Sequence, residues 1–457
     1  MFYRIFRLTV AITLRLFFRR IEVDGPRDLP AGPLLLVSNH TNALVDPLIP
    51  LIALKRRLTL TGKNVLNKNP LLALLNWGLG TIPFHRREDI GQGADPRQNV
   101  QSMRRCREIL ARGGAVCVFP EGISHSDLKM RPFHVGASRI ALDFVHKDGN
   151  PGNLQIVPLG LLYTAKGEFR SEACVRIGQP FDAGHWVAAH PEANQEELTQ
   201  EFRRRIEALT ISYENRREML IVNWANDIVA SEAQMPQPLG STPSRTMESF
   251  NRLARLQAGY RTLLADHAAD IAALSERVRR YRAELKHRGI NPAEVFLPMH
   301  PLRAILFLTR ELELILIGAP LAFFGIINHL LPYLIVRQVA GRLSSDKDHW
   351  ATNVVYPSLI IFPLFYAIQL AVAWLLLPVM WAAVYTIALP YTGYYALLYQ
   401  ERVGSAWRRA RTFVYFLFRP QTQQWLVAEG QEILAGIQEL AGHLEPESAA
   451  PPGKERP

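Results

Sequence analysis

The sequence predicts an α/β domain, layered around a largely parallel sheet, followed by a helical hairpin and C-terminal transmembrane helices. Short apolar runs alternate with amphipathic helical patterns over residues 21–181, which indicates strands and helices in turn. Polar, Arg/Glu-rich helical patterns then occupy residues 194–289. Three long apolar segments follow within residues 312–398, each long enough to cross the core of a bilayer.

These patterns divide the 457 residues into five parts. They are an interfacial amphipathic helix (1–20), an α/β domain (21–190), a helical region (191–300), a membrane-embedded region with two or three transmembrane segments (301–400) and a cytoplasmic tail (401–457). A chain of this length can form one sizeable domain with appendages.

The first twenty residues lack the long uncharged core and the small-residue cleavage site of a signal peptide. Arginines recur among them at near-helical spacing, while apolar side chains occupy the other faces. This pattern is typical of a helix that lies in the membrane interface, with its arginines on lipid head groups. A short, tilted membrane span is the alternative.

Within the α/β domain, strands are expected at residues 34–37, 115–119, 154–163 and 173–178. Amphipathic helices are expected at residues 99–112 and 135–146. The run at 34–37 is apolar throughout and follows Pro30, Gly32 and Pro33, as a buried parallel strand would. The alternation of strands and helices favours a largely parallel sheet.

The helical region repeats apolar residues three to four positions apart, as at Leu198, Phe202 and Ile206. A hairpin that packs on the α/β domain or on a second copy of the chain, as a homo-oligomer, is one interpretation; a solvated spacer is the other. The apolar segments are residues 312–336, 354–377 and 379–398, with Pro378 as a turn between the last two. The first contains Pro320 and Pro332, so re-entry remains an alternative to spanning. Arginines within 402–411 favour a cytoplasmic end there.

Composition limits the partners. Lys+Arg 52 against Asp+Glu 41 gives a net charge of +11, which suits an anionic bilayer, a phosphorylated substrate or nucleic acid. Nucleic acid is disfavoured because no basic patch is interleaved with aromatic residues and the C-terminal third is strongly apolar. Cys106, Cys117 and Cys174 lack metal-binding spacing and are expected to be reduced core residues of a cytosol-facing domain.

The stretch LLLVSNHTNALVDP at residues 34–47 places His40 and Asp46 just beyond the end of the first buried strand. Open α/β sheets carry their chemistry at this end of their strands. A neutral imidazole held by a carboxylate can take a proton from a hydroxyl group near pH 7. Taken alone the pair is weak evidence, because most His/Asp pairs at this spacing are capping or hydrogen-bonding residues.

Three further stretches accompany this one: GTIPFHRR at residues 80–87, FPEGISHS at 119–126 and IVPLG at 156–160. In order and spacing, the four stretches resemble the sequence blocks of the glycerolipid acyltransferase superfamily, the lysophosphatidate and glycerol-3-phosphate acyltransferases. The resemblance covers roughly residues 21–181, and FPEG is its most specific part. The residues NHTNALVDP, the Ile-Ser-His that follows FPEG and the hydrophobic C-terminal region are most similar to the fungal-type glycerol-3-phosphate/dihydroxyacetone-phosphate acyltransferases and their bacterial relatives.

The sequence departs from the family pattern at two places. The family usually has four residues between its His and Asp, whereas five separate His40 from Asp46. The family usually continues FPEG with Thr-Arg-Ser, whereas Ile-Ser-His follows here, so an arginine is missing. His125, Lys129 or Arg131 is expected to replace it.

The resemblance implies a membrane enzyme whose catalytic domain (21–190) lies on the cytoplasmic side. It implies acyl transfer from a thioester co-substrate, acyl-CoA or acyl-carrier protein, to a hydroxyl of glycerol 3-phosphate or dihydroxyacetone phosphate in phospholipid biosynthesis, with no metal and no further cofactor. His40 would be the general base, and Asp46 would fix its tautomer.

The resemblance also assigns roles around this pair. Arg86 best matches the family's phosphate-binding arginine, and Arg guanidinium suits phosphate oxygens. The other expected phosphate contacts are Arg87, Lys63 and Gly122. The expected structural residues of the site are Glu121 as a hydrogen-bonding brace, Pro120 beside it, and Pro158 on the acyl side.

Three alternatives stay open. Lysophosphatidate (1-acylglycerol 3-phosphate) is an alternative acceptor within the same family. A catalytically inactive membrane scaffold would keep the fold without the reaction. A metal-dependent lipid hydrolase would use His40, Asp46, His125 and His134, although these lack a local ligand motif.

Overall fold

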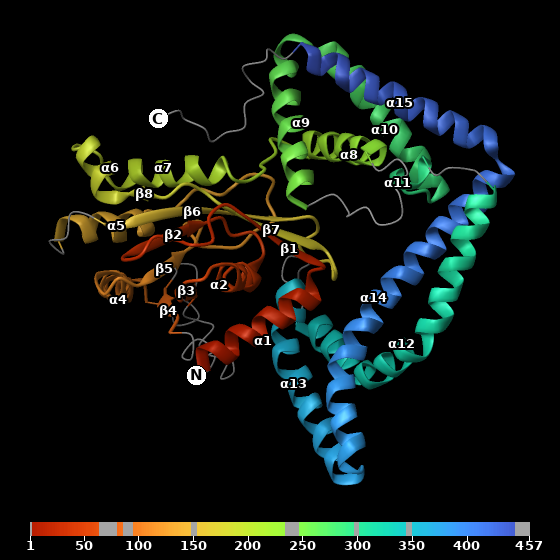
Figure 1. Cartoon of the computed structure of the whole chain (residues 1–457). Coiled ribbons are helices and arrows are strands. Elements are labelled where there is room, and N and C mark those ends of the chain that lie inside the picture. The colour runs from red at the N-terminus through yellow and green to blue at the C-terminus, as the bar shows by residue number, and fades with distance from the viewer. Residues whose placement is uncertain are drawn as a thin grey trace. The chain divides into compact units, whose positions relative to one another are not determined.

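The computed structural model describes residues 2–63, 80–85, 95–147, 153–233, 246–296, 301–343 and 350–443 (Figure 1). The chain divides into two compact units. The first comprises Met1–Ser212 with Val336–Ile361, and the second comprises Tyr213–Ile335 with Phe362–Pro457. The first unit therefore includes a short segment from the predicted membrane region.

The first unit is built on a sheet whose strands run in the order β1-β7-β6-β2-β5-β3-β4, with β8 also paired to β6. Neighbours are parallel except where β6 meets β7 and β8, so the predicted, largely parallel α/β sheet is confirmed. The strands are β1 (Arg20–Asp24), β2 (Leu34–Ser38), β3 (Leu58–Lys63), β4 (Ile82–Phe84), β5 (Ala115–Val118), β6 (Gln155–Tyr163), β7 (Glu172–Ile177) and β8 (Phe181–Asp182).

Strand β2 lies at the centre of the sheet, between β5 and β6, and is buried on both faces. Leu34 and Leu36 point into one apolar cluster, while Leu35 and Val37 point into the other, as alternation along a strand requires. Helices cover both faces and give a three-layer α/β/α arrangement (Figure 1). One face carries α1 (Phe2–Phe17) and α2 (Leu48–Ala53); the other carries α4 (Asn99–Ala111), α5 (Gly136–Lys147), α6 (Ala183–Ala189) and α7 (Gln195–Glu207).

Helix α1 differs in part from the expected interfacial helix. One face, with Phe6, Val10 and Leu14, is buried in the core of the first unit. Ile5, Leu8 and Ile12 remain more than half exposed on the opposite side. The helix therefore packs on its own domain first, and only its outer face can contact a membrane.

Helix α7 also belongs to the first unit, beyond the boundary at residue 190 that the sequence suggests. Its capping box, formed by Asn194 and Glu197, begins the helix, and Leu198, Phe202 and Ile206 are fully buried against the sheet. This spacing was expected in a hairpin that packs on the α/β domain or on a second copy of the chain, and α7 packs on the α/β domain. The unit ends instead at Ser212.

The second unit is helical. Tyr281 and Leu285 of α10 share an apolar cluster with Leu426 and Ile433 of α15, and Arg277 forms an ion pair with Glu429. Residues 401–443, which were expected from the sequence to belong to a cytoplasmic tail, are therefore helical and packed. The helices are α8 (Arg216–Ala233), α9 (Thr246–Asp266), α10 (Ala268–Arg288), α11 (Pro292–Val295), α12 (Pro301–Leu343), α13 (Trp350–Leu376), α14 (Val379–Phe418) and α15 (Pro420–Gly442).

Two segments of the described chain are long and apolar enough to cross a membrane, Thr309–Leu343 in α12 and Trp350–Leu376 in α13. Few of the side chains in their most apolar stretches are buried, 17% in the first segment and 11% in the second, and Ile317 and Leu375 are 78% and 81% exposed. The core helix of a soluble protein would be mostly buried. Helix α12 continues through Pro320 and Pro332 as one bent helix (Figure 1), in place of the broken helix that re-entry would require.

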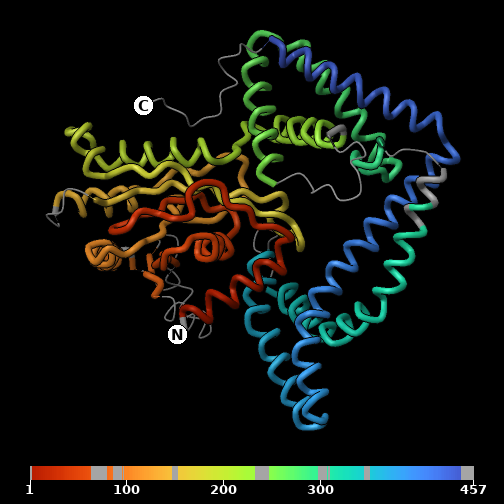
Figure 2. Tube along the Cα trace, viewed as in Figure 1, coloured from red at the N-terminus to blue at the C-terminus, as the bar shows by residue number. Residues whose placement is uncertain are grey.

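The third apolar segment lies in α14, which is not among the two candidate spans. Helix α13 ends at Leu376 and α14 begins at Val379, so Pro378 forms the turn of a helical hairpin (Figure 2). The indole Nε1 of Trp374 donates a hydrogen bond to Thr386 Oγ1 at 3.1 Å across this hairpin.

Candidate functional site

His40 and Asp46 lie together beyond the end of β2. The Nδ1 atom of His40 is 2.8 Å from Asp46 Oδ2, so the contact expected from sequence is present despite the longer spacing. An ionised carboxylate can accept a hydrogen bond but cannot donate one. The neutral His40 imidazole therefore carries its proton on Nδ1, and Nε2 carries the lone pair. The ring packs on Phe119 with centroids 4.7 Å apart and is 13% exposed.

Asp46 is fully buried and accepts two further hydrogen bonds. The backbone N–H of Asn42 donates to Oδ2 at 2.7 Å, and the hydroxyl of Tyr163 donates to Oδ1 at 2.6 Å. Burial, the charge of Asp46 and this hydrogen bond raise the pKa of Tyr163 well above its ordinary value, so the hydroxyl stays protonated as a donor. Three donors therefore fix the carboxylate that orients His40.

Glu121 braces the backbone of His40. It follows β5 in the FPEG turn, is buried, and accepts the His40 N–H at Oε1 over 2.6 Å. Its Oε2 accepts from the backbone N–H of Arg131 at 3.1 Å and contacts Nε2 of His125. The N–H of Asp127 donates to Nδ1 of His125 at 3.1 Å, so His125 carries its proton on Nε2 and donates it to Glu121. Glu121 thus links the His40 backbone to the loop that carries His125 and Arg131, and its role as a brace of the site stays a prediction.

Gly122 and Pro120 shape this turn. The amide of Gly122 donates to Phe119 O at 3.0 Å, so it is already used within the turn and not directed at a phosphate as expected. Gly122 has φ +71°, and a Cβ there would lie 2.8 Å from Cδ2 of the His134 ring. Pro120 O accepts the His134 N–H at 2.8 Å. Glycine is therefore required by conformation and by the neighbouring ring.

Lys63 is the last residue of β3 and pairs with Phe84 of β4. Strand β4 thus leads the chain towards Arg86 and Arg87. These two arginines and the side chain of Lys63 lie outside the described residues. Pro158 lies buried within β6, opposite Val37 of β2, and its carbonyl accepts the Gly178 N–H at 2.9 Å, which is a role in the sheet.

Two residues that the structure brings to the site, Tyr163 and Lys166, were assigned no role from the sequence. Tyr163, the last residue of β6, reaches Asp46 as described, and Lys166 follows three residues later. The Nζ of Lys166 lies 3.3 Å from His125 O, and its carbonyl accepts from Asn42 Nδ2 at 3.2 Å. A lysine thus stands beside the loop that lacks the family arginine. Arg131, one of the expected replacements, is engaged by Asp127 with Nε–Oδ2 2.6 Å.

Asn39, next to His40, has a supporting role. Its side-chain amide donates to Leu161 O at 3.0 Å and accepts from Leu161 N at 2.7 Å. This pair of bonds extends the ladder between β2 and β6 by one residue beyond Ser38, where β2 ends. The backbone leading into His40 is therefore fixed on both sides, by β6 and by Glu121.

The hydrolase alternative requires metal ligands. Among the described residues, no group of three or more His, Cys, Asp or Glu side chains is arranged to hold a metal ion. His40 and His125 each turn one ring nitrogen to a carboxylate, Asp46 and Glu121 respectively. The arrangement in this part of the chain is that of two hydrogen-bonded pairs.

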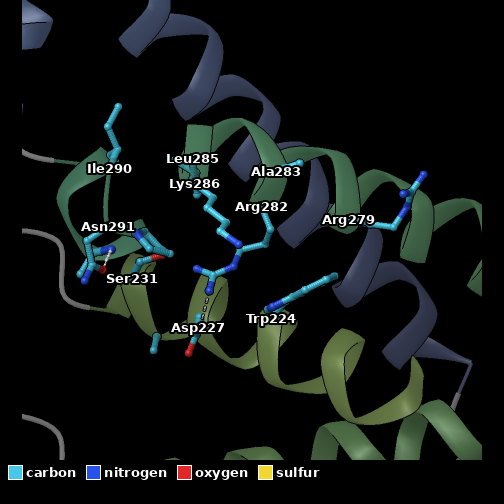
Figure 3. Close-up of a pocket in the computed structure, with 13 residues that line it drawn as sticks. Trp224, Asp227, Ser231, Arg279, Arg282, Ala283, Leu285, Lys286, Ile290 and Asn291 are labelled. Atoms are coloured by element: carbon cyan, nitrogen blue, oxygen red, sulfur yellow. Dashed lines mark hydrogen bonds and ion pairs between the residues drawn. The ribbon is translucent and has the colours of Figure 1, made fainter. Parts of the chain in front are cut away.

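A cavity of about 840 Å³ lies in the second unit, between α8, α10 and α11 (Figure 3). Trp224, Arg282 and Lys286 line it, and Arg282 lies 3.4 Å from Asp227. Arg279, also in its lining, is paired with Glu276. None of the expected site residues that the structure describes lines this cavity. Of its charged groups, Arg282 faces Asp227 across the lining, while Arg279 is paired with Glu276 outside it.

The part of the chain that carries the site is similar to known acyltransferases. Residues 20–162 match the Acyltransferase family. A chloroplastic 1-acyl-sn-glycerol-3-phosphate acyltransferase of Brassica napus is 30% identical over 151 residues, which is 33% of this chain and 39% of that protein. Glycerol-3-phosphate O-acyltransferase 1 of Saccharomyces cerevisiae is 27% identical over 191 residues, 40% of this chain and 24% of the yeast protein.

The chain thus spans about two fifths or less of the length of these two relatives. A crystal structure of the 1-acyl-sn-glycerophosphate acyltransferase from Thermotoga maritima overlaps with 18% identity and a TM-score of 0.34, covering 45% of this chain and 76% of that one.

Proposed function

Because residues 20–162 form a domain of the glycerolipid acyltransferase superfamily, we propose that this chain is a membrane-bound O-acyltransferase of phospholipid synthesis. It transfers a fatty acyl group from a thioester to a hydroxyl of a glycerol phosphate. The observation that carries the proposal is the His40–Asp46 pair, with Nδ1 held at 2.8 Å and Nε2 left to accept a proton.

In this reaction Nε2 of His40 takes the proton of the acceptor hydroxyl while the oxygen attacks the thioester carbonyl carbon. A new C–O bond forms, the C–S bond breaks, and the departing thiolate recovers the proton from the imidazolium. Asp46 stabilises the imidazolium between these steps, and Glu121 keeps the His40 backbone in place. No protein nucleophile is needed, because the thioester is already activated.

We propose glycerol 3-phosphate or dihydroxyacetone phosphate as the acceptor, with lysophosphatidate as the alternative. Relatives named for glycerol-3-phosphate and for 1-acylglycerol-3-phosphate acylation both match the domain. The acceptor phosphate requires cations, for which Arg86, Arg87 and Lys63 are our candidates, with Lys166 beside the His125 loop. Acyl-CoA or acyl-carrier protein supplies the acyl group, and no further cofactor is proposed.

The membrane assignment rests on the exposed apolar surfaces of α12 and α13. We propose the cytoplasmic side for the catalytic domain, which is supported by the arginines that follow the last apolar segment and by the free thiols of the cysteines. The exposed Ile5, Leu8 and Ile12 of α1 suit insertion at the boundary of the acyl chains, and the exposed Arg4 and Arg15 suit contact with lipid head groups on that side.

An acceptor panel tests the proposal. The purified full chain in lipid vesicles is given a radiolabelled acyl-CoA, or acyl-carrier protein, with each of the three acceptors in turn. Acylation of glycerol 3-phosphate or dihydroxyacetone phosphate well above lysophosphatidate is expected. Preference for lysophosphatidate would select the alternative acceptor, and release of free fatty acid without any acylated product would contradict acyl transfer.

A further inference from the structure

The turn between His40 and Asp46 has an unusual backbone. Ala43 has φ +41°, in the left-handed region that residues other than glycine rarely adopt. Residues Ala43–Val45 form one turn of 3₁₀-helix in which the amides of Val45 and Asp46 both donate to Asn42 O, at 3.0 and 3.4 Å. This strained turn accommodates the extra residue and still brings Asp46 back to His40.

Leu44, in the middle of the turn, is held from a distant part of the sequence. Its backbone N–H donates to Thr352 Oγ1 at 3.2 Å, and its carbonyl accepts from the hydroxyl of Tyr356 at 3.3 Å. Thr352 and Tyr356 lie four residues apart, so they are neighbours on one side of α13. One face of α13 therefore binds both the backbone N–H and the backbone carbonyl of Leu44.

The same end of α13 is packed into the first unit. Ala351, Val355 and Leu359 follow one another at four-residue spacing and belong to the apolar cluster that contains Val45 and Leu48. Ala351 and Val355 are 1% exposed, and Thr352 is 8% exposed. The contact with the turn is thus made by well-packed residues, in a helix that is itself a candidate membrane span.

We propose that Thr352 and Tyr356 are positioning residues for the His40–Asp46 pair, so that the first turns of a membrane helix set the geometry of the general base. The proposal rests on the proposed function. Leu44 lies between Asn42, whose amide holds Asp46 Oδ2, and Asp46 itself. Loss of either bond to Leu44 lets the strained turn relax, which moves Asp46 away from His40 Nδ1 and weakens proton transfer more than substrate binding.

Kinetics of the full chain in lipid vesicles tests this. Thr352→Val and Tyr356→Phe each remove one hydroxyl and should lower kcat three- to tenfold, with KM for both substrates changed less than twofold. Thr352→Ser keeps a hydroxyl that can accept the Leu44 N–H, and this variant should keep at least half of the wild-type kcat. Ser358→Ala is the control and should leave kcat unchanged, because Ser358 Oγ donates to Val354 O of the same helix and has no other hydrogen bond in the described part of the chain.

A double-mutant cycle separates positioning from a general loss of structure. If Thr352 acts through Asp46, Thr352→Val should lose most of its effect on kcat in an Asp46→Asn background. An equal fold-loss in both backgrounds would overturn the proposal, as would wild-type kcat in both single variants. Hydrogen exchange of the peptide containing Leu44 gives a readout independent of turnover, and Thr352→Val should accelerate it.

The two levels of failure differ. A wild-type chain that acylates none of the three acceptors contradicts the proposed function and, with it, the catalytic role of this contact. An active wild-type chain whose Thr352→Val and Tyr356→Phe variants keep full kcat contradicts the positioning role alone. Unchanged exchange at Leu44 in Thr352→Val would show that the hydrogen bond itself is absent.

Discussion

Tyr163→Phe removes one of the three donors to Asp46 and leaves the ring in place. The lost hydroxyl donates to Oδ1 at 2.6 Å, whereas His40 Nδ1 and the Asn42 amide both contact Oδ2. Asp46 is fully buried, so within the described part of the chain Oδ1 would have no replacement donor. The variant thus weakens the support of the carboxylate without touching its bond to His40.

The size of the effect follows from these contacts. A hydrogen bond to a charged group contributes about 1.5–3 kcal/mol, and the free energy of unfolding should fall by that amount. Because both contacts to Oδ2 remain, we expect kcat to fall by no more than about tenfold, which corresponds to about 1.4 kcal/mol in the activation barrier. KM for both substrates should stay near the wild-type value.

The pH dependence has a defined sign. The pKa of Tyr163 is raised in the folded chain, so its contribution to stability is complete below the ordinary tyrosine value of about 10. Above that pH the unfolded chain ionises and the folded chain does not, so the contribution is progressively lost as pH rises. The difference in stability between wild type and Tyr163→Phe should therefore be constant below about pH 10 and shrink above it.

Thermal unfolding and steady-state kinetics measure these quantities. Tyr213→Phe is a matched control, because Tyr213 belongs to the second unit and its hydroxyl accepts a hydrogen bond from Asn223 at 3.2 Å. Unchanged stability and kcat in Tyr163→Phe would refute the structural role of this donor. A loss of kcat as large as that expected for His40→Ala, in a folded protein, would instead make Tyr163 a participant in proton transfer.

Three other outcomes are expected. Gly122→Ala should lower Tm more than Gly32→Ala. In both variants the left-handed backbone costs about 1–2 kcal/mol, but only at Gly122 would the new Cβ also meet a ring, that of His134; equal losses of Tm would contradict this. Single cysteines introduced at Ser345 and Ser405 should react with a polar maleimide only from the cytoplasmic side. The native cysteines should react little, because burial raises the pKa of each thiol to about 12. Strong labelling from outside would refute the hairpin orientation. Arg86→Ala should raise KM for the phosphorylated acceptor and leave kcat nearly unchanged; the opposite split would make Arg86 a transition-state contact.

The central strands were predictable because their signals are local. The apolar run at 34–37 and the turn residues around it predict β2, and the structure places that strand at Leu34–Ser38. The contact between His40 and Asp46 was also predictable, since only five residues, which form one turn, lie between them. For helix α7 the sequence left two surfaces open, because a stripe such as Leu198, Phe202 and Ile206 does not reveal whether it covers the α/β domain or a second copy; in the structure it covers the sheet of the first unit.

The remainder of the site depends on distant pairing. Tyr163 lies 117 positions from Asp46 and reaches it because β6 pairs with β2 in parallel register. Thr352 lies 308 positions from Leu44 and meets it through the packing of α13. No periodicity or motif in one sequence encodes such distances, although a tyrosine at the end of a strand beside the site strand is a signal that could have been tested.

The central claim is that His40 is the general base of an acyl transfer to a glycerol phosphate. The most direct measurement is kcat of His40→Ala, with acyl-CoA and the preferred acceptor, beside His185→Ala as a control at a side chain 94% exposed on α6. The account predicts a fall of about 10²–10⁴-fold in His40→Ala with acyl-CoA binding retained, and wild-type turnover in His185→Ala. Retained turnover in a folded His40→Ala protein would contradict it.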